Sequence, residues 1–193
     1  ANLFNQGQLA VVAMQAEALT KRYPNSFVIW SFLGGANQGL GQAAKAAKAF
    51  QRVTELNPQY PEGHNNLGIV LQQLEKSEES VKSFQKALSL KPDYSEAYYN
   101  MGIALKELGK LNLAIGAYQK SLALEPTNWE AYGNMGLAFK DNGDWTEAVA
   151  AYEKALEINP YDGELFANMG NALRGQGKLE EAIEAYNKAL SIK

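Results

Sequence analysis

Residues 95–128 read SEAYYNMGIALKELGKLNLAIGAYQKSLALEPTN, and segments similar to this 34-residue stretch precede and follow it in the chain. Two residue types independently indicate the repetition: a glycine in the first half of each segment and a proline near its end. They are Gly34, Gly68, Gly102, Gly136 and Gly170, and Pro24, Pro58, Pro92, Pro126 and Pro160. Because both series keep a spacing of 34 residues, the chain is predicted to consist of structural repeats.

The repeat frame divides the chain into six units when Phe27 is taken as position 1. They are a partial unit at 1–26 (the end of a first helix and a second helix), full repeats at 27–60, 61–94, 95–128 and 129–162, and a last repeat at 163–193 that lacks its last three residues. No polar capping helix follows the last repeat. We therefore expect either a piece of a longer protein or a module whose uncovered ends associate with other copies.

Each repeat is predicted to form two antiparallel helices. Positions 4, 7, 8 and 11 fall on one face of a first helix, and positions 20, 24, 27 and 28 fall on one face of a second. Glycine at position 8 and a small residue at position 20 allow a close helix crossing, and the aromatic residue at position 24 fills the space beside it. The expected fold is an all-α, right-handed superhelical solenoid.

The turn between the two helices is marked by glycine at position 15, where a left-handed residue closes the first helix. These glycines are Gly7, Gly41, Gly109, Gly143 and Gly177. Glu75 interrupts the series, so the turn in repeat 61–94 is expected to be strained or differently shaped. Proline at position 32 ends the second helix.

Composition excludes several classes of function. The chain has no Cys and a single His, so neither a thiolate site nor a histidine metal cluster can form. Its net charge of −3 argues against a general nucleic-acid binder, and no apolar stretch is long enough to cross a membrane. We expect no enzyme activity, no cofactor and no metal, and we interpret His64, at position 4, as a replacement for the aromatic residue of the other repeats.

A column of asparagines is the most informative polar feature. Position 6 is Asn66, Asn100, Asn134 and Asn168, and Phe32 departs from the series. Asparagine is a poor residue for a helix interior, so four in register require a cause. A side-chain amide offers both a donor and an acceptor, as an extended peptide backbone requires. We therefore predict that a peptide lies in a concave groove along this column; the alternative is that the asparagines only solvate the surface.

Neighbouring positions would give the groove its selectivity. Position 2 is Glu in four repeats, and position 12 becomes basic in the second half of the chain. Besides the four asparagines, the predicted peptide-binding residues are Asn65, Tyr99, Asn171, Lys106, Lys140 and Arg174.

Together, the period, the small residues, the aromatics and the proline make the chain resemble the tetratricopeptide repeat (TPR) family. Segments such as Tyr99-Asn100-Met101-Gly102 are most similar to the repeats of O-linked N-acetylglucosamine transferases. That resemblance implies an asparagine ladder that holds substrate polypeptide by its backbone. The clamp for a C-terminal carboxylate found in co-chaperone TPR domains needs Lys at position 2, where this chain has Val28 and then Glu, so it is expected to be absent.

Three roles follow from this sequence. The first is a protein-interaction module that binds an extended peptide or a partner helix. The second is the substrate-recruiting arm of a larger glycosyltransferase or sulfotransferase, and the third is a scaffold that self-associates through its ends. In each case the expected partner is a protein or peptide, with no nucleic acid and no membrane.

Overall fold

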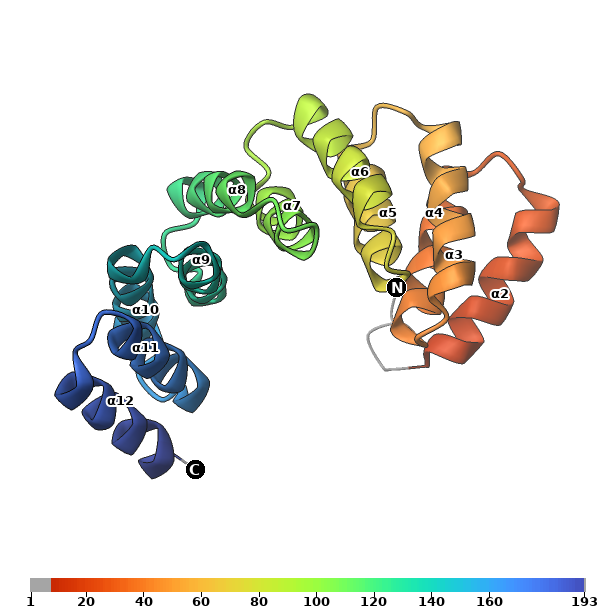
Figure 1. Cartoon of the computed structure of the whole chain (residues 1–193). Helices are drawn as coiled ribbons and strands as arrows, with labels where there is room; N and C mark the ends of the chain where they lie inside the picture. Colours follow the sequence, from red (N-terminus) through yellow and green to blue (C-terminus); the bar gives the residue numbers. More distant parts are fainter. Residues whose placement is uncertain (1–7, 193) are drawn as a thin grey trace. The chain divides into compact units, whose positions relative to one another are not determined.

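The computed structural model describes residues 8–192, and every element of regular structure in this range is an α-helix (Figure 1). The first helices of the repeats are α3 (Phe27–Gly39), α5 (Pro61–Gln73), α7 (Ser95–Glu107), α9 (Trp129–Asn142) and α11 (Gly163–Gly175). The second helices are α2 (Leu9–Arg22), α4 (Ala43–Leu56), α6 (Ser77–Leu90), α8 (Leu111–Leu124), α10 (Trp145–Ile158) and α12 (Leu179–Ser191). None of these described helices has the length and apolar character needed to cross a bilayer.

These helices follow the 34-residue frame closely. Each first helix begins at position 1, and each second helix begins at position 17. The prediction of an all-α fold built from antiparallel helix pairs is therefore confirmed. The predicted end of a first helix within 1–26, together with Gly7, lies outside the described residues.

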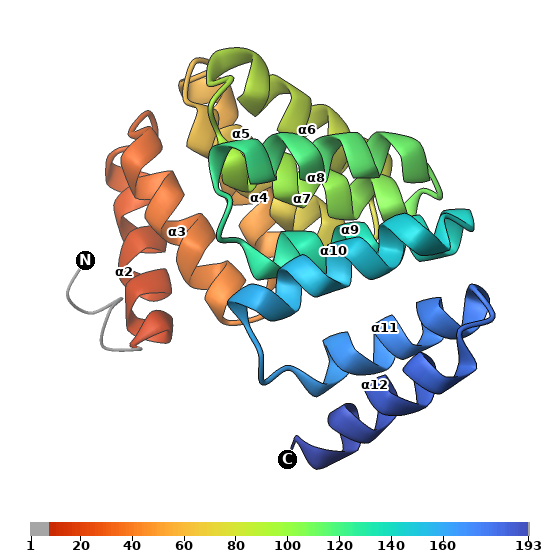
Figure 2. The same ribbon diagram turned by 90° about the vertical axis from the view of Figure 1, so that its left-hand side faces the viewer.

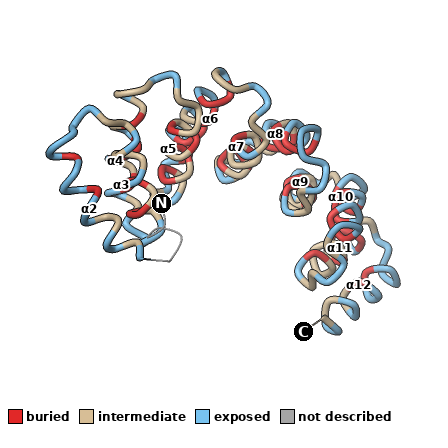
Figure 3. Tube along the Cα trace, turned by 180° about the vertical axis from the view of Figure 1, so that it is seen from behind, coloured by how far each residue is buried: buried red, intermediate tan, exposed pale blue. Residues whose placement is uncertain are grey.

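The chain forms two compact units, residues 1–100 and 101–193, and the division falls within α7. In the first unit, α2 packs on α3, α3 on α4, α4 on α5, and α5 on α6. In the second unit the same succession runs from α8 to α12, and α11 and α12 lie side by side in Figure 2. Within each unit, buried residues lie where neighbouring helices face one another (Figure 3).

Each hairpin is closed by an aromatic ring that lies over a glycine. A Cβ atom at the position-8 glycine would lie only 2.5 to 2.8 Å from the ring at position 24 of the same repeat. The pairs are Gly34 with Phe50, Gly68 with Phe84, Gly102 with Tyr118, Gly136 with Tyr152, and Gly170 with Tyr186. The prediction of a close crossing at position 8 is confirmed, and the ring is what occupies the space of the missing side chain.

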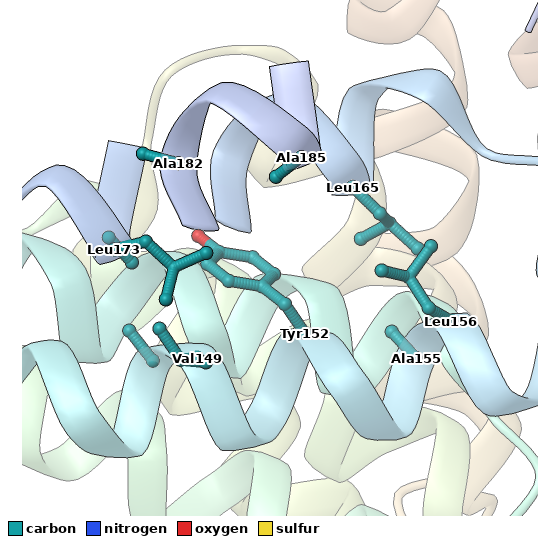
Figure 4. Close-up of a cluster of buried hydrophobic side chains, with 10 residues drawn as sticks. Val149, Tyr152, Ala155, Leu156, Leu165, Leu173, Ala182 and Ala185 are labelled. Atoms are coloured by element: carbon teal, nitrogen blue, oxygen red, sulfur yellow. The ribbon is translucent and has the colours of Figure 1, made fainter. Parts of the chain in front are cut away.

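The second unit shows how these rings join the core. Tyr152 of α10 is fully buried and packs with Leu165 and Leu173 of α11 (Figure 4). Ala182 and Ala185 of α12 complete the same cluster. One ring therefore contacts its own first helix and the next repeat, so the repeats stabilise each other by apolar burial.

Glu75 adopts the left-handed conformation that glycine adopts in the other turns. Its φ is 59°, and the described glycines at position 15 have φ between 68° and 88°. The Glu75 N–H donates to the Gln72 carbonyl, and the Lys76 N–H donates to the Leu71 carbonyl, each at 2.9 Å. This is the usual closure of a helix by a left-handed residue. The turn was expected to be either strained or differently shaped. It is strained, because a non-glycine residue has a positive φ, and it has the same left-handed closure as the other turns.

The starts of the first helices differ between the units. In the second unit, Asn128 Oδ1 accepts from the Ala131 N–H at 2.9 Å, and Asp162 Oδ1 accepts from the Leu165 N–H at 3.0 Å. In the first unit, the equivalent Ser26 and Tyr60 make no side-chain cap. The Tyr60 ring instead packs against Phe27, with the ring centres 5.4 Å apart.

Candidate functional site

Positions 2, 6 and 9 of a first helix share a face, because 3.6 residues per turn place them within an arc of about 60°. In repeat 27–60 this relation is visible directly, since Val28, Phe32 and Gly35 line one pocket. The opposite face is buried against other helices, as position 11 illustrates. Asn37, Leu71, Leu105 and Leu173 are all buried there. We call the face formed by positions 2, 6 and 9 the asparagine face.

The four asparagines at position 6 are each partly buried on this face. Within residues 8–192, the side-chain amides of Asn66, Asn100 and Asn168 make no intramolecular hydrogen bond. Asn66 and Asn100 belong to the first unit, and Asn134 and Asn168 belong to the second. Each unit therefore presents two asparagines in register on successive first helices.

Asn65 lies elsewhere, fully buried. Its Nδ2 donates to Glu96 Oε1 of the next repeat at 3.2 Å, and within the described chain its Oδ1 has no partner. Position 5 is turned toward the next repeat, as Gly133 also shows, because a Cβ there would lie 2.9 Å from Leu165. In this structure, Asn65 joins two repeats and is closed to a ligand, whereas Tyr99, at the same position, is partly buried.

Glutamates at position 2 make the first unit acidic around two tyrosines. Burial first, and then the carboxylates of Glu96 and Glu62, together raise the pKa of Tyr94 to about 12. The pKa of Tyr60 is also raised, by burial first and then by Glu62. Lys91 compensates in part, with its Nζ 3.8 Å from Glu62 Oε1 and 4.6 Å from the centre of the Tyr94 ring.

Basic residues at position 12 characterise the second unit. Burial lowers the pKa of the Lys106 amine, and nearby Lys140 lowers it further, while Asp141 and Glu107 act in the opposite direction. Lys140 Nζ lies 3.3 Å from Asp141 Oδ1. Two of the three predicted basic residues therefore lie close enough to interact, and the third, Arg174, is exposed.

The side chain of Asn171, at position 9, makes a hydrogen bond within its own repeat. Its Oδ1 accepts a hydrogen bond from the Tyr186 hydroxyl at 3.0 Å. The hydroxyl of Tyr152, one repeat earlier, is buried and has no partner among the described residues. Burial raises its pKa. The Asn171 amide nitrogen is not used by the hydrogen bond with the Tyr186 hydroxyl.

An apolar pocket in the first unit is a feature that the sequence analysis missed. It has a volume of about 300 Å³ and is lined by Phe27, Val28, Ser31, Phe32, Gly35 and Tyr60. The signal for it was present in the sequence, because repeat 27–60 replaces the Glu, Asn and aliphatic residue of positions 2, 6 and 9. Those departures mark where the surface changes from polar to apolar.

The imidazole of His64 has a structural role. Its Nε2 lies 3.0 Å from the Pro58 carbonyl, and Trp30 Nε1 donates to the Pro24 carbonyl at 2.9 Å. A carbonyl only accepts hydrogen bonds, so Nε2 of His64 carries the proton. Both rings therefore tie a first helix to the link before it. Among the described residues, no group of His, Asp and Glu could hold a metal ion.

Comparison with protein families gives matches over most of the chain. Models described as TPR repeat match residues 40–75 and 73–109, and models described as tetratricopeptide repeat match residues 95–128 and 130–193. Among curated protein sequences, no relative matches this chain.

Solved structures of similar fold cover most of the chain. A crystal structure of MamA protein is 28% identical with a TM-score of 0.80, covering 86% of this chain and 90% of that chain. MamA 41-end from Desulfovibrio magneticus RS-1 is 21% identical with a TM-score of 0.82, covering 86% and 94%. YrrB, described as a TPR protein with an unusual peptide-binding site, is 20% identical with a TM-score of 0.79, covering 94% and 93%. The last two likenesses show a shared fold alone.

Proposed function

Because the chain belongs to the tetratricopeptide repeat family, we propose that it is a protein-interaction module that binds an extended polypeptide on its asparagine face. One observation carries the proposal. Asn66, Asn100 and Asn168 occupy the same position of three repeats with amides that no intramolecular hydrogen bond uses within residues 8–192. A partly buried amide loses hydrogen bonds to water, so a ligand that restores them gains free energy.

The spacing of the asparagines suits a peptide backbone. Packed helices stand about 8–10 Å apart, and an extended chain advances about 3.3–3.6 Å per residue. One asparagine per repeat therefore meets roughly every third residue of a peptide. Since the amide contacts the backbone, the affinity carries little sequence preference.

Side chains around the asparagines would then select the ligand. In the second unit, Lys106, Lys140 and Arg174 favour an acidic residue, and the Asn171 amide nitrogen adds a donor. In the first unit, Tyr99 offers a partly buried ring beside Asn100. We leave Asn65 out of the contact set, because it is fully buried. We assign no catalytic step to the chain, and we propose that the partner of the chain is a protein or peptide.

Resemblance of the repeats to those of O-linked N-acetylglucosamine transferases supports a finer version of this role, in which the module recruits substrate polypeptide for a catalytic domain. The description of YrrB as having a peptide-binding site also favours a peptide as the ligand. The complete reading frame of the parent gene separates a recruiting arm from an independent adaptor, because only the former is joined to a transferase domain.

Paired asparagine variants test the proposal in each unit separately. Short unstructured peptides selected on the full chain by phage display serve as the probe. Asn134→Ala with Asn168→Ala, or Asn66→Ala with Asn100→Ala, is expected to weaken binding by about tenfold, as two lost hydrogen bonds require. The matched control is Asn112→Ala with Asn187→Ala, since both asparagines are exposed on second helices. Equal binding by all three double variants, with unchanged helicity, would refute the proposal.

Self-association is a second candidate, favoured by the surface of α12. Ile183 and Leu190 are 58% and 77% exposed, whereas Val149 and Leu156, at the same positions of repeat 129–162, are 9% and 8% exposed. Such an apolar surface is a site of association. Light scattering of the full chain over a wide concentration range is expected to show a rising mass, and Ile183→Lys with Leu190→Lys is expected to abolish the rise. A constant monomer mass would remove this candidate.

A further inference from the structure

The apolar pocket of the first unit gathers exposed apolar side chains around one concavity. Val28 and Phe32 are 48% and 43% exposed, and the tilted rings of Phe27 and Tyr60 stand next to them. Single exposed apolar side chains are common, but several lining one concavity mark a site of recognition. Its volume of about 300 Å³ is at the lower end of the range of ligand pockets, which suits one large side chain.

The pocket is continuous with the asparagine face. Val28, Phe32 and Gly35 hold positions 2, 6 and 9, where the next repeat has Glu62, Asn66 and Ile69. A peptide held by Asn66 therefore reaches the pocket one repeat, or roughly three residues, further along. At this point a side chain of the peptide contacts apolar rings. In the other repeats, an asparagine amide contacts the peptide backbone instead.

Charge beside the pocket is negative. Glu62 is two residues after the pocket residue Tyr60 and raises the pKa of its hydroxyl. Glu62 and Glu96 both lie near Tyr94. Lys91 is the basic residue in this cluster, and its amine is 3.8 Å from Glu62, too far for a strong hydrogen bond. Two carboxylates against one ammonium group leave a site that attracts a cation.

We propose that this pocket holds a bulky apolar side chain of the bound peptide and that Glu62 selects a cationic residue close to that side chain. The inference rests on the proposed function, to which it adds a side-chain preference. Burial of the apolar side chain supplies affinity, since it removes ring surface on both partners from water. The carboxylate supplies specificity and a dependence on salt.

The test uses the full chain labelled with nitrogen-15 and a capped hexapeptide, acetyl-Ser-Ala-Phe-Ala-Lys-Ser-amide. Titration is followed by NMR at the backbone amides of Ser31, Phe32 and Gly35. A peptide with Ala in place of Phe is expected to bind about tenfold more weakly, as loss of one buried aromatic side chain requires. A peptide with Glu in place of Lys is expected to bind about threefold to tenfold more weakly at low salt and equally at high salt.

Protein variants assign each preference to a residue. Phe32→Asn and Val28→Glu, which introduce the residues of the other repeats, are each expected to abolish the preference for Phe over Ala. Glu62→Gln is expected to remove the preference for Lys over Glu and to keep the preference for Phe. Leu113→Asn is the control, because Leu113 is an exposed apolar residue on α8, outside the pocket. Circular dichroism and melting verify that each variant is folded.

Three outcomes would overturn the inference. They are unchanged binding by both Phe32→Asn and Val28→Glu, shifts that gather away from the pocket, and shifts that appear without peptide as the protein is concentrated. The last would assign the pocket to a second copy of the chain. Failure of the proposed function is distinguishable, because Asn66→Ala with Asn100→Ala would then leave peptide binding unchanged while Phe32→Asn still abolishes the preference for Phe over Ala.

Discussion

Residues 8–100 and residues 101–192 are built from the same helical hairpin but present different surfaces. The first unit replaces the asparagine of one repeat by Phe32, opens an apolar pocket and keeps acidic residues beside it. The second unit keeps asparagine at position 6 in repeats 129–162 and 163–193, and Lys106 and Lys140 lie close together at position 12. The lesson is that the hairpin core leaves positions 2, 6, 9 and 12 free to differ, so one scaffold carries two kinds of recognition surface.

The largest expected effect tests whether the hairpins of the two units have the same core packing. Gly68→Leu in the first unit and Gly136→Leu in the second would each drive a side chain into the ring of Phe84 or Tyr152. Both variants are expected to lose about 3 kcal/mol of unfolding free energy through overpacking. Thermal and urea denaturation measure the loss. Gly116→Ala is the control, because no atom lies within 4 Å of a Cβ there, and it is expected to be neutral or stabilising. A large loss in one unit alone would break the comparison.

Turn conformation gives the next largest difference between the units. Gly143→Ala places a side chain at a φ of 88° and is expected to cost about 1–2 kcal/mol. Glu75→Gly relieves the strain already present in the first unit and is expected to stabilise it by about 0.5–1 kcal/mol. Denaturant midpoints of the two variants measure these opposite shifts. Destabilisation by Glu75→Gly would show that the glutamate side chain contributes more than its backbone conformation costs.

Helix capping sharpens the comparison further. Asn128→Ala removes the hydrogen bond to the Ala131 N–H and is expected to cost about 1 kcal/mol. Ser26→Ala, at the same position of the first unit, removes no cap and is expected to change stability by less than about 0.5 kcal/mol. Urea unfolding of the two single variants measures both values. Equal losses would mean that Ser26 caps α3 in solution.

The smallest effect concerns the hydroxyl groups on the hairpin rings. Tyr152→Phe gives the second unit the residue that the first has at Phe50 and Phe84, and it removes a buried hydroxyl that has no partner in the described chain. It is expected to be neutral or to stabilise by up to about 1 kcal/mol. Tyr186→Phe breaks the hydrogen bond to Asn171 and is expected to cost about 0.5–1 kcal/mol. The difference between the two melting temperatures measures the contrast, and a reversed sign would contradict it.

The fold was predictable because the period of 34 residues repeats the same packing problem five times. Glycine at position 8 facing an aromatic residue at position 24 has one close-packed solution, so the sequence pattern was sufficient. The strain at Glu75 was predictable for the same reason, since five turns out of six have glycine there.

The candidate site was less predictable because it depends on angles within a helix. Asn65 and Asn66 are adjacent in sequence, but 100° of rotation turns one toward the next repeat and leaves the other on the asparagine face. The hydrogen bond from Asn65 to Glu96 links residues of different repeats, and a pattern within one repeat contains no information on it. The apolar pocket likewise combines α3 with Tyr60, which precedes the next first helix. Whether the four asparagines contact a ligand stays a prediction.

The pairing of each ring with a glycine of its own hairpin bears on how such a chain can change length. Excising residues 129–162 in register would leave the other four pairs of a position-8 glycine with a position-24 ring intact, because each of these pairs lies within one repeat. Gene duplication or loss of a single hairpin therefore preserves the glycine–ring packing inside the remaining hairpins. The number of recognition positions can change in this way without redesign of the core.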